Sequence, residues 1–235
     1  MAHVLPLAVS DLRNVLRDRM LAFAFFIPLL LILFSAWAIP WSSATIVDLS
    51  HYHSLILSFI FLQIPVIFGF IPAFMLIDER DENILSALRV VPVSPLSFVA
   101  VRLLSGTTIA FLYAAMAFVL LGGTGTSFLL FLPCACMFAL LAPIIALTIV
   151  GLSQNKIEAL AVFKGLDLLV MLPLLGFFVP PAWEYLFWVF PQFWTIAAFE
   201  ELVQSGVLDW GAVGVGLVLH VGVIGYLIRR FVRGF

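Results

Sequence analysis

The densest cluster of ionisable side chains in this 235-residue sequence lies between two long apolar runs. Residues 78–95 read Asp-Glu-Arg-Asp-Glu-Asn-Ile-Leu-Ser-Ala-Leu-Arg-Val-Val-Pro-Val-Ser-Pro. After five polar residues, Ile84, Leu85 and Leu88 recur on one face of a short predicted helix. That helix must end near Pro92, which has no backbone N–H to donate. Carboxylates and guanidinium groups beside a narrow apolar face suit a contact with another protein, although an ordinary charged loop between two membrane spans would have a similar composition.

No catalytic constellation accompanies this stretch. The glycine-rich turn Gly122-Gly123-Thr124-Gly125 lacks the Gly-Lys-Ser/Thr of a phosphate-binding loop, and no serine stands in a G-x-S-x-G or S-x-x-K pattern. Asp48, His51 and His53 are the candidate metal ligands, but three residues scattered through one loop favour polar groups at a membrane surface. The sequence therefore predicts neither a catalytic residue nor a metal site.

Composition places the charged stretch in a membrane protein. Hydrophobic residues make up 64% of the chain and charged residues 10%, and the mean hydropathy is +1.23. A soluble domain of this size could not bury so much apolar surface. We therefore expect an all-α membrane protein with a single domain over residues 1–235. The six predicted spans cover about residues 20–39, 54–77, 98–121, 127–150, 159–179 and 211–228.

Two further segments, residues 10–19 and 180–210, are predicted to be helical in addition to the six spans. Residues 10–19 form an amphipathic helix at the membrane surface, capped by Ser10. Its apolar face comprises Leu12, Val15 and Leu16. Residues 180–210 begin at Pro180-Pro181 and are too long and too apolar for a simple loop. They form either a seventh span or a helical insertion that re-enters the bilayer or lies on its outer surface.

The basic residues decide between these alternatives. With six spans, all eleven Lys and Arg residues fall on one side of the membrane, and the positive-inside rule makes that side, with both termini, cytoplasmic. A seventh span would move Arg229, Arg230 and Arg233 to the outside. With six spans, all six tryptophans lie near the outer interface, where amphipathic rings prefer to sit. We therefore predict six spans.

The charged stretch resembles the first cytoplasmic loop of the ABC-2 type transporter permeases. That family has an acidic E-R-E-x-G-T-L-like run after its second span and Pro-x-Ser a few residues later. Here the run is Glu79-Arg80-Asp81-Glu82-Asn83-Ile84-Leu85, followed by Leu88 and Pro92-Val93-Ser94, with Asn83 in place of the usual Gly and Ile84 in place of Thr. In size and order of segments, the chain is most similar to drug-export permeases of the fluoroquinolone-exporter kind.

The resemblance implies that residues 78–95 form a coupling helix seated on a separate ATP-hydrolysing subunit, present in two copies. The residues implied in this contact are Glu79, Arg80, Asp81, Glu82, Asn83, Leu85, Leu88 and Pro92. ATP and Mg would be held by that partner, so no cofactor is expected on this chain. A second six-span permease subunit, identical or homologous, would complete the pathway within the cytoplasmic membrane of a bacterium or archaeon. Membrane lipid is the other expected partner, and no nucleic acid is expected.

The same resemblance implies that spans 2 and 5 line the transport pathway. The expected lining residues are Gln63, Phe68, Phe163 and Met171. In span 5, Lys164 and Asp167 lie three residues apart, so we expect them to neutralise each other. Apart from this pair, Gln63 and a few hydroxyl groups, the spans are apolar. An interior of such low polarity favours an amphipathic or lipophilic cargo over hydrated ions.

Two alternatives remain at the level of sequence. A haem-export permease of cytochrome maturation has the same size and layout, and His51 and His53 are the residues that favour this alternative. From a different class, a polytopic membrane enzyme would place its active site in the outer insertion, where the acids are Glu184, Glu200 and Glu201. No nucleophile and base accompany those acids. A neighbouring gene for a stand-alone ATPase would favour the exporter.

Overall fold

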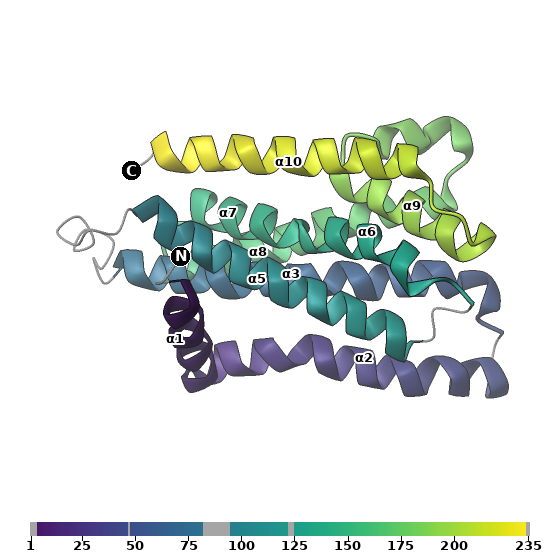
Figure 1. Ribbon diagram of the computed structural model, residues 1–235, viewed down its shortest axis with the longest axis horizontal. Coiled ribbons are helices and arrows are strands. Elements are labelled where there is room, and N and C mark those ends of the chain that lie inside the picture. Colours follow the sequence, from purple (N-terminus) through teal and green to yellow (C-terminus); the bar gives the residue numbers. More distant parts are fainter. Residues whose placement is uncertain (1–3, 47, 82–94, 122–124, 234–235) are drawn as a thin grey trace.

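The computed structural model describes residues 4–46, 48–81, 95–121 and 125–233 of the chain. In these ranges all regular secondary structure is helical (Figure 1). The elements are α1 (Val4–Arg17), α2 (Arg19–Thr45), η1 (Ser50–Tyr52), α3 (His53–Asp81), α5 (Pro95–Leu120), α6 (Phe128–Ala139), α7 (Leu141–Leu152), α8 (Lys156–Met171), η3 (Leu172–Phe178), η4 (Pro181–Phe187), α9 (Pro191–Ser205) and α10 (Trp210–Arg233).

Six helical segments of the described chain are long and apolar enough to cross a membrane. They are α2, η1 with α3, α5, α6 with α7, α8 with the start of η3, and α10. Figure 1 shows the long helices running side by side, with α1 and the C-terminal end of α10 at one end of the bundle and α9 at the other. We call these the α1 end and the α9 end. The predicted fold class and number of spans are confirmed.

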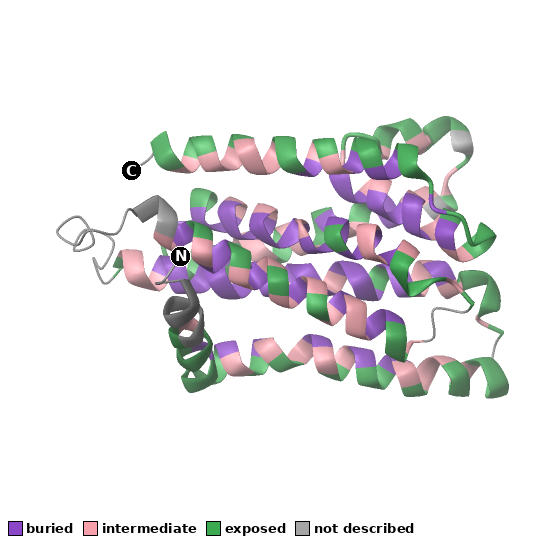
Figure 2. Cartoon of the chain, in the orientation of Figure 1, coloured by how far each residue is buried: buried purple, intermediate pink, exposed green. Residues whose placement is uncertain are grey.

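Helix α3 is the centre of the bundle. In its most apolar window 72% of residues are buried, compared with 22% in α2, α8 and α10, and Figure 2 shows the same contrast between buried α3 and α7 and the more exposed α2 and α10. Glycines allow the close packing: a Cβ on Gly69 would lie 2.6 Å from the carbonyl oxygen of Ala142, and one on Gly106 would lie 2.8 Å from that of Phe68. Both glycines therefore serve helix contacts of α3.

The predicted fourth span consists of two helices. Helix α6 ends at Ala139 and α7 begins at Leu141, with a turn at Leu140. Pro143 lies four residues after Ala139, so it cannot donate the backbone hydrogen bond that a continuous helix would make to the Ala139 carbonyl. The two helices together form one of the six candidate spans, Phe128–Leu152.

The N-terminal helix begins earlier than predicted, and Ser10 does not cap it. Helix α1 spans Val4–Arg17, so Ser10 lies within it. The capping residue is Asp18, whose carboxylate accepts the backbone N–H groups of Met20 and Leu21 at 2.8 and 3.0 Å and so begins α2. Figure 1 shows α1 lying across the end of α2 rather than along it.

The charged stretch does not begin a new helix at Asp78. Helix α3 continues without interruption to Asp81, and α5 begins at Pro95. Four of the residues predicted to belong to the coupling helix, 78–81, are therefore the last turn of α3. The remaining part of that prediction, from Glu82 to Ser94, lies outside the described residues.

The insertion at the α9 end packs into the bundle. It comprises the short η4 and the 15-residue α9. Gly206 follows α9 with φ of 72°, a left-handed conformation that glycine adopts without strain. Phe199 of α9 is 0% exposed, and its ring lies 5.1 Å from Phe61, 5.7 Å from Phe131 and 6.0 Å from Phe138. Helix α9 is therefore anchored in the bundle through Phe199, and it is not among the six candidate spans of the described residues.

Candidate transport site

A polar contact joins α3 and α8 in the apolar middle of the bundle. The Gln63 side chain donates from Nε2 to Oδ1 of Asp167 at 3.0 Å. Gln63 lies ten residues into α3 and Asp167 eleven residues into α8, which is about 15 Å along each helix axis. That depth is about half of a hydrocarbon core of roughly 30 Å. The contact therefore lies far from either end of both spans.

Lys164 lies close by but does not pair with Asp167 as predicted. Its side chain is exposed, and within the described residues it forms no ion pair. Asp167 has the Gln63 amide as its partner instead. The predicted neutralisation of Lys164 by Asp167 is therefore wrong.

The exposed Lys164 indicates what surrounds α8 in the membrane. Lys164 lies eight residues into α8, about 12 Å from the start of the helix. Placing a lysine at the centre of a lipid-facing span costs roughly 2.5–3.5 kcal/mol. This face of α8 also carries the exposed Gly165 and Leu168. It is thus suited to a water-filled path or to a second protein chain rather than to lipid alone.

The four residues expected to line the pathway do not all lie together. Phe163 of α8 is half-buried against Phe70 of α3, with ring centroids 4.4 Å apart, and Met171 is half-buried at the end of α8. Phe68 is 1% exposed and turns to the other side of α3, where its ring contacts Phe25 and Tyr113. Phe68 therefore does not join the contact between α3 and α8.

Phe70 was missed, although the sequence contains a signal for it. Gln63 and Phe70 are seven residues apart, which is two helical turns, so they share the face of α3 that meets α8. Phe68 lies five residues from Gln63, on a different face. Continuous hydrophobicity along α3 concealed this difference, because apolar residues surround the helix on all sides.

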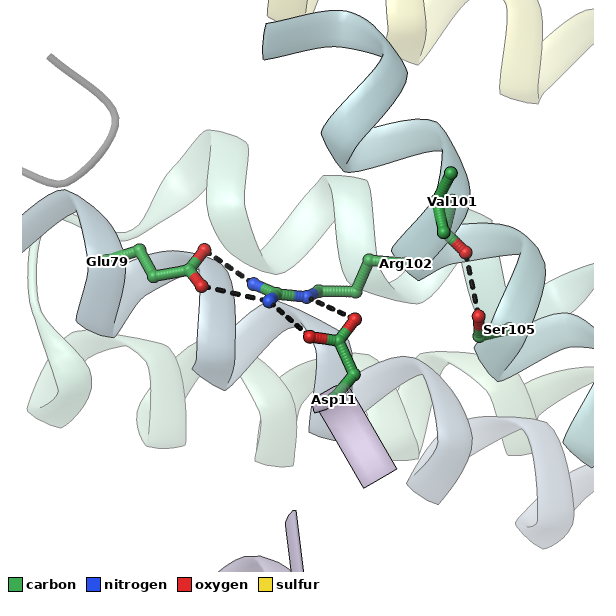
Figure 3. Close-up of polar contacts among 5 residues, drawn as sticks. All are labelled: Asp11, Glu79, Val101, Arg102 and Ser105. Carbon is green, nitrogen blue, oxygen red and sulfur yellow. Dashed lines mark hydrogen bonds and ion pairs between the residues drawn. The ribbon is translucent and has the colours of Figure 1, made fainter. Parts of the chain in front are cut away.

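At the α1 end, a buried arginine joins three helices (Figure 3). Arg102 of α5 donates to Glu79 of α3 from both terminal nitrogens, at 2.5 and 2.9 Å, and to Asp11 of α1 from Nε and Nη2, at 3.2 and 2.8 Å. The exposed fractions of these side chains are 4%, 17% and 15%. The Arg102 guanidinium also lies 4.7 Å from the centre of the Phe98 ring. We call Asp11, Glu79 and Arg102 the arginine cluster.

The arginine cluster brackets the charged stretch. Glu79 lies in the last turn before residues 82–94 and Arg102 lies two turns after α5 begins, so the cluster ties both ends of that stretch to α1. Sequence reasoning assigned Glu79 to a partner contact and did not single out Asp11. A signal was present: Asp11 is four residues before Val15, which is 5% exposed, so both share the buried face of α1.

The other described residues of the charged stretch also have defined places. Arg80 donates from Nη2 to the Ser153 carbonyl at 2.6 Å and from Nη1 to that of Val150 at 3.4 Å, at the C-terminal end of α7. Asp78 pairs with Lys156 of α8, and Asp81 is exposed. The remaining residues predicted for coupling lie outside the described residues: Glu82, Asn83, Leu85, Leu88 and Pro92.

At the α9 end, acidic residues lie beside hollows. Glu184 and Glu200 line a cavity of about 280 Å³, and Glu200 also lines a wider hollow of about 890 Å³ with His51 and His53. Burial raises the pKa of Glu200 above its ordinary range, partly offset by the hydrogen bond from Gln204, and the charges of Glu184 and Glu201 act in the same direction as burial. Among the described residues, no three His, Cys, Asp or Glu side chains are placed to hold one metal ion together.

Six candidate spans, with a part-buried polar contact between two of them, define a multi-pass membrane protein. The chain belongs to the Rv2686c-like family, described as fluoroquinolones export permease proteins, which matches residues 11–228. It is 30% identical over 190 residues to the fluoroquinolones export permease protein Rv2686c of Mycobacterium tuberculosis strain H37Rv and to its counterpart MT2760 in strain CDC 1551 / Oshkosh. Each alignment covers 78% of this chain and 74% of the relative.

Proposed function

We propose that this chain is the membrane-spanning subunit of an ATP-driven exporter of the ABC-2 type. A separate ATP-hydrolysing subunit, in two copies, would hold ATP and Mg, because the sequence contains no nucleotide-binding motif. The chain itself would bind no cofactor and catalyse no reaction. Its family and its two mycobacterial relatives support a role in drug export.

The observation that carries this proposal is the exposed, charged face of α8. Lys164 lies about 12 Å along this span and is exposed, and only 22% of the most apolar window of α8 is buried. A second six-span subunit facing α8 and α3 would enclose this face and create a path between the two chains. Gln63, Phe70, Phe163, Asp167 and Met171 would contribute to its wall.

The chemistry of this face supports an amphipathic, aromatic cargo with charges of both signs. A fluoroquinolone carries a carboxylate, a basic amine and a flat fused ring. Lys164 would meet the carboxylate, Asp167 the ammonium group, and the Phe163 ring the flat face of the cargo. Opposite charges three residues apart on one span suit such a zwitterion better than a simple ion.

We further propose that the α1 end is cytoplasmic. Within the described residues, basic side chains lie on α1, at the starts of α2 and α5, in the first half of α8, and at the ends of α3 and α10, which all belong to the half of the bundle near the α1 end (Figure 1). The six tryptophans belong to the opposite half. ATP binding by the motor would then act on the charged stretch, and the arginine cluster would pass the movement to α3, α5 and α1.

The decisive experiment combines partner recovery with drug accumulation. A tagged chain is purified from its own host in mild detergent, and co-purifying proteins are identified by mass spectrometry. In parallel, ciprofloxacin accumulation is measured in cells that lack the gene, with and without a restored copy. We expect recovery of a stand-alone ATPase and higher accumulation in the deletion, reversed by the restored copy. If a well-folded chain is purified without an ATPase, the proposal of a separate motor subunit is contradicted. If ciprofloxacin accumulation is unchanged, the proposed cargo is contradicted.

A further inference from the structure

An open-sided cavity lies at the α1 end between α3, α7 and α10, away from the polar contact of α3 with α8. Its volume is about 330 Å³. Its lining includes Arg80 of α3, Leu147, Val150 and Leu152 of α7, and Leu227 and Arg230 of α10. Two guanidinium groups and several leucines in one cavity combine strong positive charge with apolar walls, and neither the transport site nor the arginine cluster uses these residues together.

The two arginines have no carboxylate partner in the part of the chain that the structure describes. Arg80 donates only to backbone carbonyl groups there, and Arg230 is exposed. The acidic side chains on the last turn of α3 form no ion pair with Arg80 or Arg230 among the described residues. Asp78 pairs with Lys156, Glu79 pairs with Arg102, and Asp81 is exposed. The cavity therefore keeps a net positive lining that an anion would neutralise.

The arginines lie at the depth of lipid headgroups. Trp210 begins α10 at the α9 end, and Arg230 follows it by twenty residues, which is roughly 30 Å along the helix. The hydrocarbon core of a bilayer is also about 30 Å thick. With Trp210 at one interface, Arg230 reaches the opposite interface, where the phosphates of that leaflet are found.

Two apolar lining residues, Leu147 and Leu227, lie one helical turn deeper than Val150 and Arg230. Leu227 precedes Arg230 by three residues on α10, and Leu147 precedes Val150 by three residues on α7. Both helices run toward the α1 end, so both leucines lie on the side of the membrane interior (Figure 1). The cavity thus has a cationic rim above an apolar wall, which is the polarity of a glycerophospholipid seated with its headgroup at the rim. An inorganic anion would use only the rim.

We propose that this cavity binds an anionic glycerophospholipid, with its phosphate between Arg80 and Arg230 and an acyl chain along Leu147 and Leu227. Basic pockets between spans are a known basis for binding anionic headgroups. Arg80 holds the end of α7 and lies in the last turn of α3, so a lipid bound there stabilises the junction from which the charged stretch emerges. This proposal is independent of the export function, because lipid binding requires neither motor nor cargo.

The test is native mass spectrometry of the purified full chain with added phosphatidylglycerol or phosphatidylcholine. We expect phosphatidylglycerol to bind about tenfold more tightly, and Arg230→Gln to remove that preference, as expected for the loss of one charge-assisted contact. Arg229→Gln is the matched control, since it removes the same charge from the neighbouring exposed position, which does not line the cavity. It should keep the preference.

A second variant and a competitor separate the binding of a lipid from the binding of a simple anion. Leu227→Trp fills the cavity and retains both arginines, so it should also abolish the preference for phosphatidylglycerol. Inorganic phosphate at millimolar concentration should not displace the lipid. Equal binding of the two lipids, equal loss in Arg229→Gln, or a preference that survives Leu227→Trp would overturn the proposal. Displacement by inorganic phosphate would identify a soluble anion as the ligand and overturn it as well.

Discussion

The Arg102 guanidinium meets the Glu79 carboxylate through both of its terminal nitrogens, at 2.5 and 2.9 Å, while Asp11 approaches the same guanidinium from α1. One cation thereby joins the helix before residues 82–94, the helix after them and the N-terminal helix. Its side chain is only 4% exposed. An arginine buried to this extent needs its carboxylates, so the arginine cluster couples the positions of three helices.

Glu79→Ala should destabilise the protein more than Asp78→Ala. The first change leaves the buried Arg102 with one carboxylate instead of two and should cost about 3 kcal/mol, the lower end for breaking a buried pair. The second breaks the ion pair of Asp78 with Lys156. Because the side chains of Asp78 and Lys156 are 35% and 45% exposed, this change should cost less than about 1 kcal/mol. Thermal midpoints in detergent measure both. Equal shifts for the two neighbours would contradict the role of the arginine cluster.

If the proposed ATPase subunit binds at the end of α3, Asp81→Lys should weaken its recovery without unfolding the chain. Asp81 is exposed at the end of α3, so reversing its charge changes the surface offered to a partner rather than the core. Reversal at Glu79 is a poorer test, because a lysine there would face the buried Arg102. Pull-down with the ATPase measures the contact, and the thermal midpoint is the control. Full recovery of the ATPase with Asp81→Lys would place the contact elsewhere.

Lys164→Gln should impair export and leave the fold intact. Lys164 is exposed and forms no ion pair among the described residues, so its replacement by glutamine breaks no ion pair there. If it meets the carboxylate of the cargo, ciprofloxacin accumulation should rise severalfold, as expected for about 1–2 kcal/mol of lost charge-assisted binding. Lys156→Gln, at the start of the same helix, is the control. Normal accumulation with Lys164→Gln would remove this residue from the pathway.

Gly69→Ala should destabilise the bundle, whereas Gly165→Ala should not. A methyl group on Gly69 would lie 2.6 Å from the Ala142 carbonyl oxygen and 2.8 Å from Cβ of Ile145, so α3 and α7 must separate. Such overpacking typically costs about 1–3 kcal/mol. Gly165 has nothing within 4 Å of the added methyl group. Thermal midpoints of the two variants test the packing, and a loss limited to Gly165→Ala would contradict it.

Glu200→Gln should stabilise the protein at neutral pH and have little effect in acid. Burial raises the pKa of Glu200, so as pH rises the unfolded chain releases this proton before the folded chain does. Stability therefore falls as pH increases from the ordinary glutamate pKa of about 4.3 to the raised folded value, and the penalty persists above it. Glutamine has no proton to release and can still accept the Gln204 hydrogen bond.

Thermal midpoints measured from pH 4 to pH 8 test this sign. The difference between Glu200→Gln and the unmodified chain should grow with pH. Asp81→Asn, which removes a carboxylate from an exposed position at the α1 end, is the control. A difference that shrinks as pH rises would show that the Glu200 carboxylate is stabilised in its charged form instead.

The sequence by itself determined that this is an all-helical, six-span membrane protein. Spans depend on the transfer free energy summed over about twenty consecutive residues, so each can be recognised without knowledge of its neighbours. The turn at Leu140 within the fourth span cannot be recognised in this way, because one missing hydrogen bond at Pro143 does not alter that sum. The family resemblance likewise rested on consecutive residues in the charged stretch.

Only the tertiary structure decided which faces meet. Phe68 and Phe70 are equally apolar, yet one turns toward α2 and α5 and the other toward α8. The pairing of Asp167 with Gln63 joins positions 104 residues apart, and that of Arg102 with Asp11 joins positions 91 apart. In a span that is apolar on every side, periodicity does not indicate the buried face. The buried face is determined by where glycines allow close approach and by which polar partners lie within reach. Both depend on how the helices are packed together.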